Sequence, residues 1–138
     1  MPFRFIAIIF SLCLLLSSCL TQADQKTEAD QMVKSLHTAI QKHHWDEAAK
    51  LFDPNYFKQY PKDVWIKQFN NAFQDLGEIK SFNLSSQQKD PRFGGDFYIY
   101  IISIVHTHGI SHETITLVKP INGDPMLITG YQFKAKSH

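Results

Sequence analysis

Cysteine is scarce in this sequence, and the motifs of common cofactor sites are missing. Only Cys13 and Cys19 occur among 138 residues, which excludes a disulfide-rich scaffold and a multi-cysteine zinc module. Lysine and arginine (14) balance aspartate and glutamate (13), so we expect no nucleic-acid partner and no acidic tail. No GxGxxG, P-loop, HExxH or GxSxG pattern is present. We therefore expect no cofactor and no nucleotide, zinc-protease or serine-hydrolase site.

The chain does contain enough apolar material for one folded domain. Apolar residues make up 43% of it and aromatic residues 13%, a composition typical of a globular core rather than a disordered chain. A length of 138 residues suits one domain and no more.

The N-terminus has the pattern of an export signal. Arg4 precedes an apolar run from Phe5 to Leu16, and signal peptides have this order of charged and apolar regions. A membrane-spanning helix needs roughly 20 apolar residues. The run is short for such a helix, although an uncleaved anchor is the alternative. We expect residues 1–18 to be a cleaved signal peptide.

A lipid-attachment motif follows the apolar run. Leu16-Ser17-Ser18-Cys19 resembles the lipobox of bacterial lipoproteins. The resemblance implies that Cys19 receives a diacylglyceryl group, becomes the first residue after cleavage and is acylated on its amine. Residues 19–26 are then the lipidated cysteine and a short tether, and two or three acyl chains hold a protein firmly on a membrane. Leu20 rather than aspartate follows the cysteine, which in Gram-negative lipoproteins implies the outer membrane, facing the periplasm.

Residues 27–138 are expected to form a single α+β domain in which helices precede strands. Apolar residues recur at helical spacing in three stretches, which end near His43, at Phe52 and at Leu76. After Gly77 the pattern becomes that of strands. The sequence therefore predicts three N-terminal helices packed on a curved, cone-shaped antiparallel sheet of about four strands.

Two turns predict the register of this sheet. A two-residue turn at Gly109-Ile110 would place His106 opposite Glu113. An Asn122-Gly123 turn would place Leu117 opposite Ile128 and Ile115 opposite Gly130. Chain breaks are expected at Asp90-Pro91-Arg92 and at Gly94-Gly95.

This register divides the strand residues between two faces of the sheet. The face expected in the core beneath the helices carries Tyr98, Tyr100, Ile102, Ile104, Ile115, Leu117, Met126 and Ile128. The opposite face is more apolar than a freely solvated one should be. We expect it to form a two-fold homodimer through Phe97, Ile99, Ile101, Val118, Leu127, Tyr131 and Phe133. The alternative is that the C-terminal tail or a loop of the same chain covers this face.

Three helices followed by a curved antiparallel sheet resemble the nuclear-transport-factor-2-like (cystatin-like) fold. The C-terminal third carries a more specific likeness, to an exported bacterial family of unknown function that ends in the pattern ETxTLV…DG.W…GY.F. The matching residues are Glu113-Thr114-Ile115-Thr116-Leu117-Val118, Asn122-Gly123 and Gly130-Tyr131-Gln132-Phe133. Met126 stands where that family has tryptophan. The family has no established catalytic residues, so the resemblance implies none here.

A few side chains are candidates for chemistry or ligand binding. The predicted pair of His106 and Glu113 favours a general base, because a neighbouring carboxylate raises the pKa of an imidazole and fixes its tautomer. Tyr98, Tyr100 and Trp65 are candidates for contacts with a ligand. An ordinary cross-strand ion pair and aromatic core residues are the simpler interpretation.

The remaining histidines predict no metal site. His106 and His108 share a face in the expected register, but His112 falls on the other face, and two histidines make a poor zinc site. We therefore expect a lipid-anchored periplasmic protein that acts as a non-catalytic binding or assembly module. The alternative is a small-molecule carrier or an acid–base enzyme that uses a pocket between helices and sheet with His106 and Glu113.

Overall fold

The computed structural model describes residues 23–135. The expected signal peptide and Cys19 lie outside these residues. An N-terminal helix (residues 23–41) comes first. It is followed by α2 (Trp45–Ala49), α3 (Tyr56–Gln59), α4 (Lys62–Leu76), β1 (Ile79–Arg92), β2 (Gly95–His106), β3 (Ile110–Pro120) and β4 (Leu127–Ala135). The strands form one antiparallel sheet in the order β1-β2-β3-β4, which confirms the predicted α+β class and the four strands.

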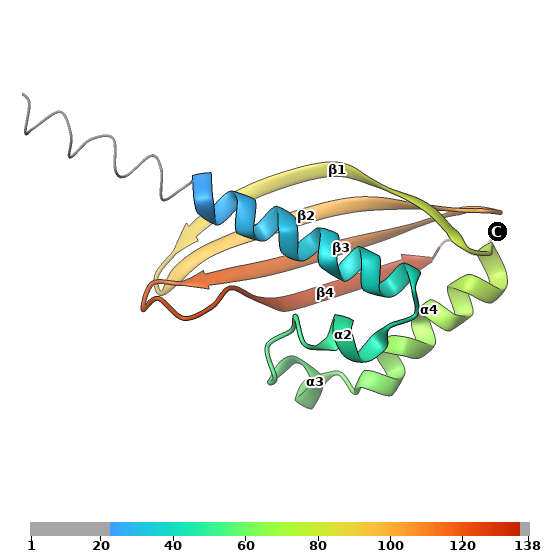
Figure 1. Cartoon of the computed structure of the whole chain (residues 1–138), viewed down its shortest axis with the longest axis horizontal. Helices are drawn as coiled ribbons and strands as arrows, with labels where there is room; N and C mark the ends of the chain where they lie inside the picture. Colours follow the sequence, from blue (N-terminus) through green and yellow to red (C-terminus); the bar gives the residue numbers. More distant parts are fainter. Residues whose placement is uncertain (1–22, 136–138) are drawn as a thin grey trace, which may run out of the picture.

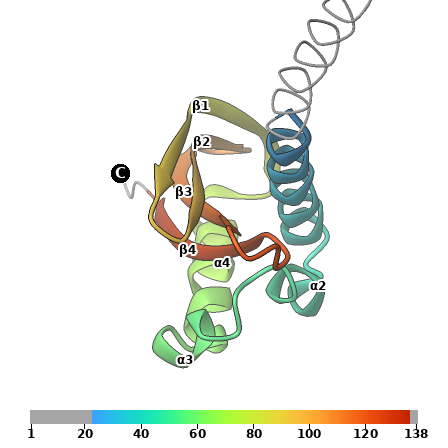
Figure 2. The same ribbon diagram turned by 90° about the vertical axis from the view of Figure 1, so that its left-hand side faces the viewer.

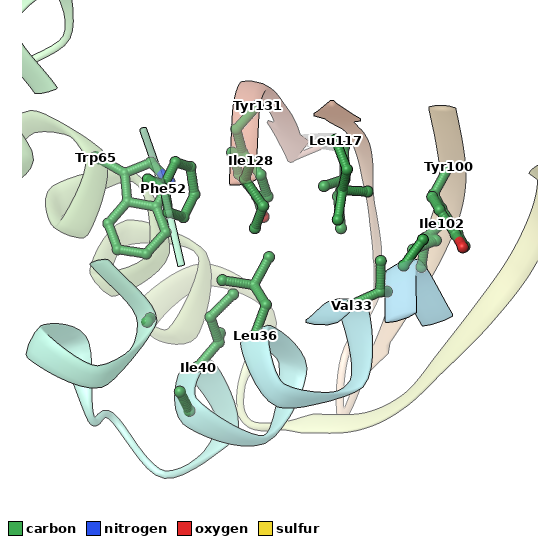
Figure 3. Close-up of a cluster of buried hydrophobic side chains, with 14 of the residues drawn as sticks. Val33, Leu36, Ile40, Phe52, Trp65, Tyr100, Ile102, Leu117, Ile128 and Tyr131 are labelled. Atoms are coloured by element: carbon green, nitrogen blue, oxygen red, sulfur yellow. The ribbon is translucent and has the colours of Figure 1, made fainter. Parts of the chain in front are cut away.

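The helices and the sheet enclose one core. The N-terminal helix runs along the length of the sheet, and α4 lies beside β4 at one end (Figures 1 and 2). Figure 3 shows Val33, Leu36 and Ile40 of the N-terminal helix facing Leu117 and Ile128 of the sheet. The predicted core face of the sheet is confirmed, because each of its eight residues is at most 3% exposed.

The helices differ from the prediction in number and length. Residues 23–135 contain four helical segments where we expected three. The additional one, α3, has four residues, too few to show an apolar periodicity. The second helix ends at Ala49 rather than at Phe52. The N-terminal helix includes residues 23–26, which we assigned to the tether.

Strand β1 continues through the residues where we expected a break. Asp90, Pro91 and Arg92 pair with β2 in a regular ladder. Proline lacks an N–H group, and β1 tolerates it because an edge strand has one unpaired side. The turn to β2 consists of Phe93 and Gly94, whose φ of +99° suits glycine.

The turn between β2 and β3 lies two residues earlier than predicted. Val105 pairs with Ile110, and the N–H of His106 donates to the carbonyl of Gly109 at 2.9 Å. Thr107 and His108 therefore form the turn. Their N–H groups donate to the carbonyls of Glu78 and Leu76 at 3.0 and 2.8 Å. Because these carbonyls belong to the last residue of α4 and to the connection that follows it, the turn is fixed by a contact that local turn preferences cannot reveal.

Because the turn lies earlier than predicted, every residue of β2 pairs with a different residue of β3. Each side chain nevertheless stays on the predicted face of the sheet. Ile102, rather than His106, lies opposite Glu113. Relative to the prediction, each residue meets a partner four positions away. An even displacement keeps side chains on the same face of a sheet, which is why the core-face prediction holds although the pairing was wrong.

The predicted pairing of β3 with β4 is confirmed near the turn and is wrong farther from it. Leu117 pairs with Ile128 as predicted, but the register then shifts, so that Ile115 faces Tyr131 instead of Gly130. The turn itself is longer than Asn122-Gly123, because β3 ends at Pro120 and β4 begins at Leu127. A β-bulge of this kind adds one residue to one strand and reverses the faces of the residues that follow it.

Because of this bulge, Tyr131 and Phe133 do not lie on the outer face of the sheet, where we expected them. Tyr131 is 8% exposed and belongs to the core, and Phe133 packs on Phe69 with ring centroids 4.7 Å apart. The predicted dimer surface therefore loses two of its seven residues. The dimer stays a prediction, which now depends on Phe97, Ile99, Ile101, Val118 and Leu127.

Candidate functional site

A buried carboxylate lies at the centre of the candidate site. Glu113 lies on the same face of β3 as Ile115 and Leu117 and is 1% exposed. Oε1 of Glu113 contacts Nε2 of His37 on the N-terminal helix, and Oε2 contacts the hydroxyl of Tyr131 on β4. An ionised carboxylate only accepts hydrogen bonds, so both partners donate. A single carboxylate thus links the helix to two strands.

His37 stands between this carboxylate and the surface. Its ring stacks on Phe82 of β1, with centroids 3.7 Å apart and planes 4° apart. Within residues 23–135, no group hydrogen-bonds to Nδ1 of His37, and this atom is not among the buried polar atoms without a partner. Nδ1 is therefore accessible from outside the core.

A cleft opens beside His37, between the N-terminal helix and strands β1 and β2. Its volume is about 470 Å³. Val33, Phe82, Leu84 and Ile102 form its apolar wall, and its polar lining residues are Asp30, Lys34, His37, Thr38, Gln41, Ser81 and Tyr100. The cleft thus combines an apolar middle with polar groups that come mainly from one helix.

A second polar cluster lies on the same helix, nearer its N-terminus than His37. The hydroxyl of Tyr100 donates to Oδ1 of Asp30 at 2.6 Å, and Lys26 donates to Oδ2 at 2.6 Å. Gln87 donates to the hydroxyl of Tyr100 at 2.7 Å. Burial raises the pKa of Asp30, but the hydrogen bonds from Lys26 and Tyr100 and the charge of Lys26 outweigh it, so that this pKa lies below its ordinary value. Asp30 is therefore a carboxylate at neutral pH.

The polar clusters around Asp30 and around His37 lie about as far apart as the two ends of a small molecule. Asp30 and His37 are seven residues apart on one helix, which corresponds to about 10 Å along its axis. Both residues line the cleft, and Val33 lies between them. The cleft therefore has a polar group near each end, with Val33 and the lysine Lys34 between them on the helix side and an apolar wall on the sheet side.

The sequence-predicted pair of His106 and Glu113 is wrong. Nδ1 of His106 lies 2.9 Å from the carbonyl oxygen of Gly77, and Nε2 lies 2.8 Å from the hydroxyl of Ser111. His106 therefore supports the turn after β2, and the oxygens of Glu113 bond to His37 and Tyr131 instead. The misplaced turn is the cause, because it put His106 opposite Glu113 in the expected register.

The three candidate aromatic residues lie in different places. Tyr100 lines the cleft, as its candidacy requires. The hydroxyl of Tyr98 donates to Gln25 at 3.0 Å, and Tyr98 does not line the cleft. Trp65 is 3% exposed and packs edge-on against Phe52, with ring centroids 5.3 Å apart (Figure 3). Trp65 is therefore a core residue.

We did not predict a role for His37 from the sequence, although its position in the sequence indicates one. It lies four residues after Val33 and three residues before Ile40, so it borders the apolar stripe of its helix. Glu113 lies on the predicted core face with Ile115 and Leu117. A titratable residue on each of two apolar faces that pack together indicates a buried pair, since buried charges need partners.

The part of the chain that the structure describes contains no cluster of three or more histidine, cysteine, aspartate or glutamate residues placed to hold a metal ion. Across residues 23–135, no helix has the length and apolar character needed to cross a membrane.

Comparisons with known proteins show the fold alone. No family model matches the chain, and no curated protein matches it. Among solved structures, the chain is similar to Bdellovibrio bacteriovorus Bd1075, with a TM-score of 0.54 and 16% identity. The match covers 80% of this chain and 40% of that chain, so the protein described here spans less than half the length of its structural neighbour.

The buried tyrosines predict a loss of stability at alkaline pH. Burial raises the pKa of Tyr56 to about 12. It is also the main reason why the pKa values of Tyr98, Tyr100 and Tyr131 are raised. These groups keep their protons in the folded state while the unfolded chain loses them above its ordinary value of 10.0. Their contribution to stability is fully present below pH 10 and decreases as the pH rises above it.

We therefore expect the free energy of unfolding to fall above pH 10, and the folded chain to show less tyrosinate absorbance at about pH 11 than the chain in urea. Tyr100→Phe should make the alkaline decrease less steep. Identical tyrosinate titrations of the folded and unfolded chains would contradict the prediction.

Proposed function

We propose that the protein is a lipid-anchored bacterial envelope protein. The support is the apolar run after Arg4 together with Leu16-Ser17-Ser18-Cys19. In this proposal residues 1–18 are removed, Cys19 carries the lipid, and Leu20 directs the protein to the outer membrane, facing the periplasm. The N-terminal helix is present from residue 23 onward, so only a few residues separate the lipid from the folded domain.

We also assign the domain to the nuclear-transport-factor-2-like fold. The order of helices before a four-stranded antiparallel sheet supports this assignment. It fits the resemblance of the C-terminal strands to an exported family, although the turn sequence departs from that pattern at Met126.

We propose that the domain is a non-catalytic binding module and that its cleft binds a small amphipathic ligand. The observation that carries this proposal is the cleft itself, of about 470 Å³, with an apolar wall and polar groups at both ends. Small-molecule sites have volumes of about 300–1,000 Å³ and this mixture of apolar walls and a few polar groups. The enzyme that we considered as an alternative required His106 beside Glu113, and His106 bonds to Gly77 and Ser111 instead.

The lipid anchor predicts the mass of the mature protein. Mass spectrometry of protein extracted from membranes should find a chain that begins at Cys19 and carries a diacylglyceryl group. Cys19→Ala should abolish lipidation and leave the chain uncleaved or released, whereas Cys13→Ala should change neither. An intact Met1 or an unmodified Cys19 would contradict the anchor.

The cleft predicts that one bulky substitution prevents binding. N-phenyl-1-naphthylamine, a fluorescent dye that has an apolar body and one N–H donor, should bind residues 20–138, a segment that includes the whole described core. Ser81→Trp places a large side chain in the cleft and should weaken binding at least about tenfold, as ligand pockets depend on open volume. Ser86→Trp is the matched control, because Ser86 lies on the same strand but does not line the cleft.

Fluorescence titration measures both variants. Binding that Ser81→Trp leaves unchanged, or that both variants reduce equally, would mean that the dye does not occupy the cleft.

A further inference from the structure

The chemistry of the two ends of the cleft restricts what it binds. At one end, Nδ1 of His37 is accessible and has no partner within the described residues. At the other end, Asp30 has a side chain that is 45% exposed. A carboxylate offers about four acceptor positions on its two oxygens, and Tyr100, Gln87 and Lys26 occupy only part of them.

Glu113 determines which nitrogen of His37 carries the hydrogen. A neutral imidazole has one N–H donor and one acceptor nitrogen, and the hydrogen bond at one nitrogen fixes the role of the other. Because the Glu113 carboxylate accepts from Nε2, neutral His37 has its hydrogen on Nε2. Nδ1 then carries the lone pair. The stacked ring of Phe82, 3.7 Å away, holds the imidazole in this orientation.

We infer that the cleft takes a ligand with an apolar middle and an N–H or O–H donor at each end, such as a diamine or an amino alcohol, and that it discriminates against dicarboxylates. One donor bonds to Nδ1 of His37, and the other bonds to Asp30, about 10 Å away along the helix. A carboxylate presented to Nδ1 has no hydrogen to donate and meets a lone pair. This inference rests on the proposed binding function and adds the class of ligand to it.

The buried network makes the inference testable through one substitution. In Glu113→Gln, the amide oxygen should face the hydroxyl of Tyr131, because no other described residue accepts from that hydroxyl. The amide NH₂ then donates to Nε2 of His37, which must become the acceptor. The hydrogen of neutral His37 moves to Nδ1, and the end of the cleft changes from an acceptor to a donor.

The nitrogen chemical shifts of the His37 ring report this change directly. We would record them for the full lipidated chain in lipid nanodiscs at about pH 9, with and without Glu113→Gln. The wild-type ring should carry its hydrogen on Nε2 and the variant ring on Nδ1. A wild-type ring with hydrogen on Nδ1, alone or together with Nε2, would overturn the inference. A tautomer unchanged by Glu113→Gln would overturn it as well.

Two water-soluble probes of similar length then test the class of ligand. Hexamethylenediamine has donors at both ends, and suberate has acceptors at both ends. In the wild type, the diamine should bind at least about tenfold more tightly than suberate, and Glu113→Gln should remove most of this preference. Asp30→Asn should weaken binding of the diamine but leave the tautomer of His37 unchanged, because Asp30 does not contact the Glu113 network.

The outcomes separate this inference from the proposed function. Equal binding of the diamine and suberate, or binding of suberate alone, would overturn the ligand class and leave the binding function in place. The same holds if neither probe binds while Ser81→Trp still weakens binding of N-phenyl-1-naphthylamine. If neither the probes nor the dye bind the cleft, the proposed binding function itself is wrong.

Discussion

The fold and the cleft are arranged around the carboxyl group of Glu113, the one acidic side chain that is buried among residues 23–135. It is 1% exposed, and a buried charge is costly unless hydrogen-bond donors surround it. The donors come from His37 on the N-terminal helix and Tyr131 on β4. Removing one partner of such a pair typically costs about 3–5 kcal/mol. The position of the helix against the sheet is therefore fixed by a specific polar contact as well as by the apolar side chains around it.

This contact also accounts for the place of the cleft. The N-terminal helix bonds to the sheet near both ends of the cleft, through His37 to Glu113 and through Asp30 to Tyr100. Between these points it lies beside β1 and β2 without filling the space, and the cleft of about 470 Å³ opens there. The helix that forms one wall of the cleft is also the element nearest in sequence to Cys19. In the proposed function, the membrane anchor and the ligand site thus belong to the same segment of the chain.

Much of the fold was predictable from the sequence, and the errors have definite causes. The core face of the sheet was correct because alternation along a strand survives any even change of register. The pairing of β2 with β3 was wrong because the N–H groups of Thr107 and His108 bond to carbonyls at the C-terminal end of α4 and just beyond it, far away in sequence. Tyr131 was placed on the wrong face because a bulge near Thr116 has no clear sequence signal. Of the candidate site, Glu113 and Tyr100 were found, but His37 was not. His37 borders the apolar stripe of its helix, and which strand residue it meets depends on how the helix packs on the sheet.

The central claim is that His37 and Glu113 stabilise each other and thereby hold the helix on the sheet. A double-mutant cycle with His37→Phe and Glu113→Leu, measured by urea unfolding, tests this claim most directly. Phenylalanine keeps an aromatic ring against Phe82, and leucine removes the charge. Each single variant should lose stability, and the double variant should lose less than the two losses combined, with a coupling of about 2 kcal/mol or more. Losses that add to within about 0.5 kcal/mol would contradict the account, because the two residues would then act independently.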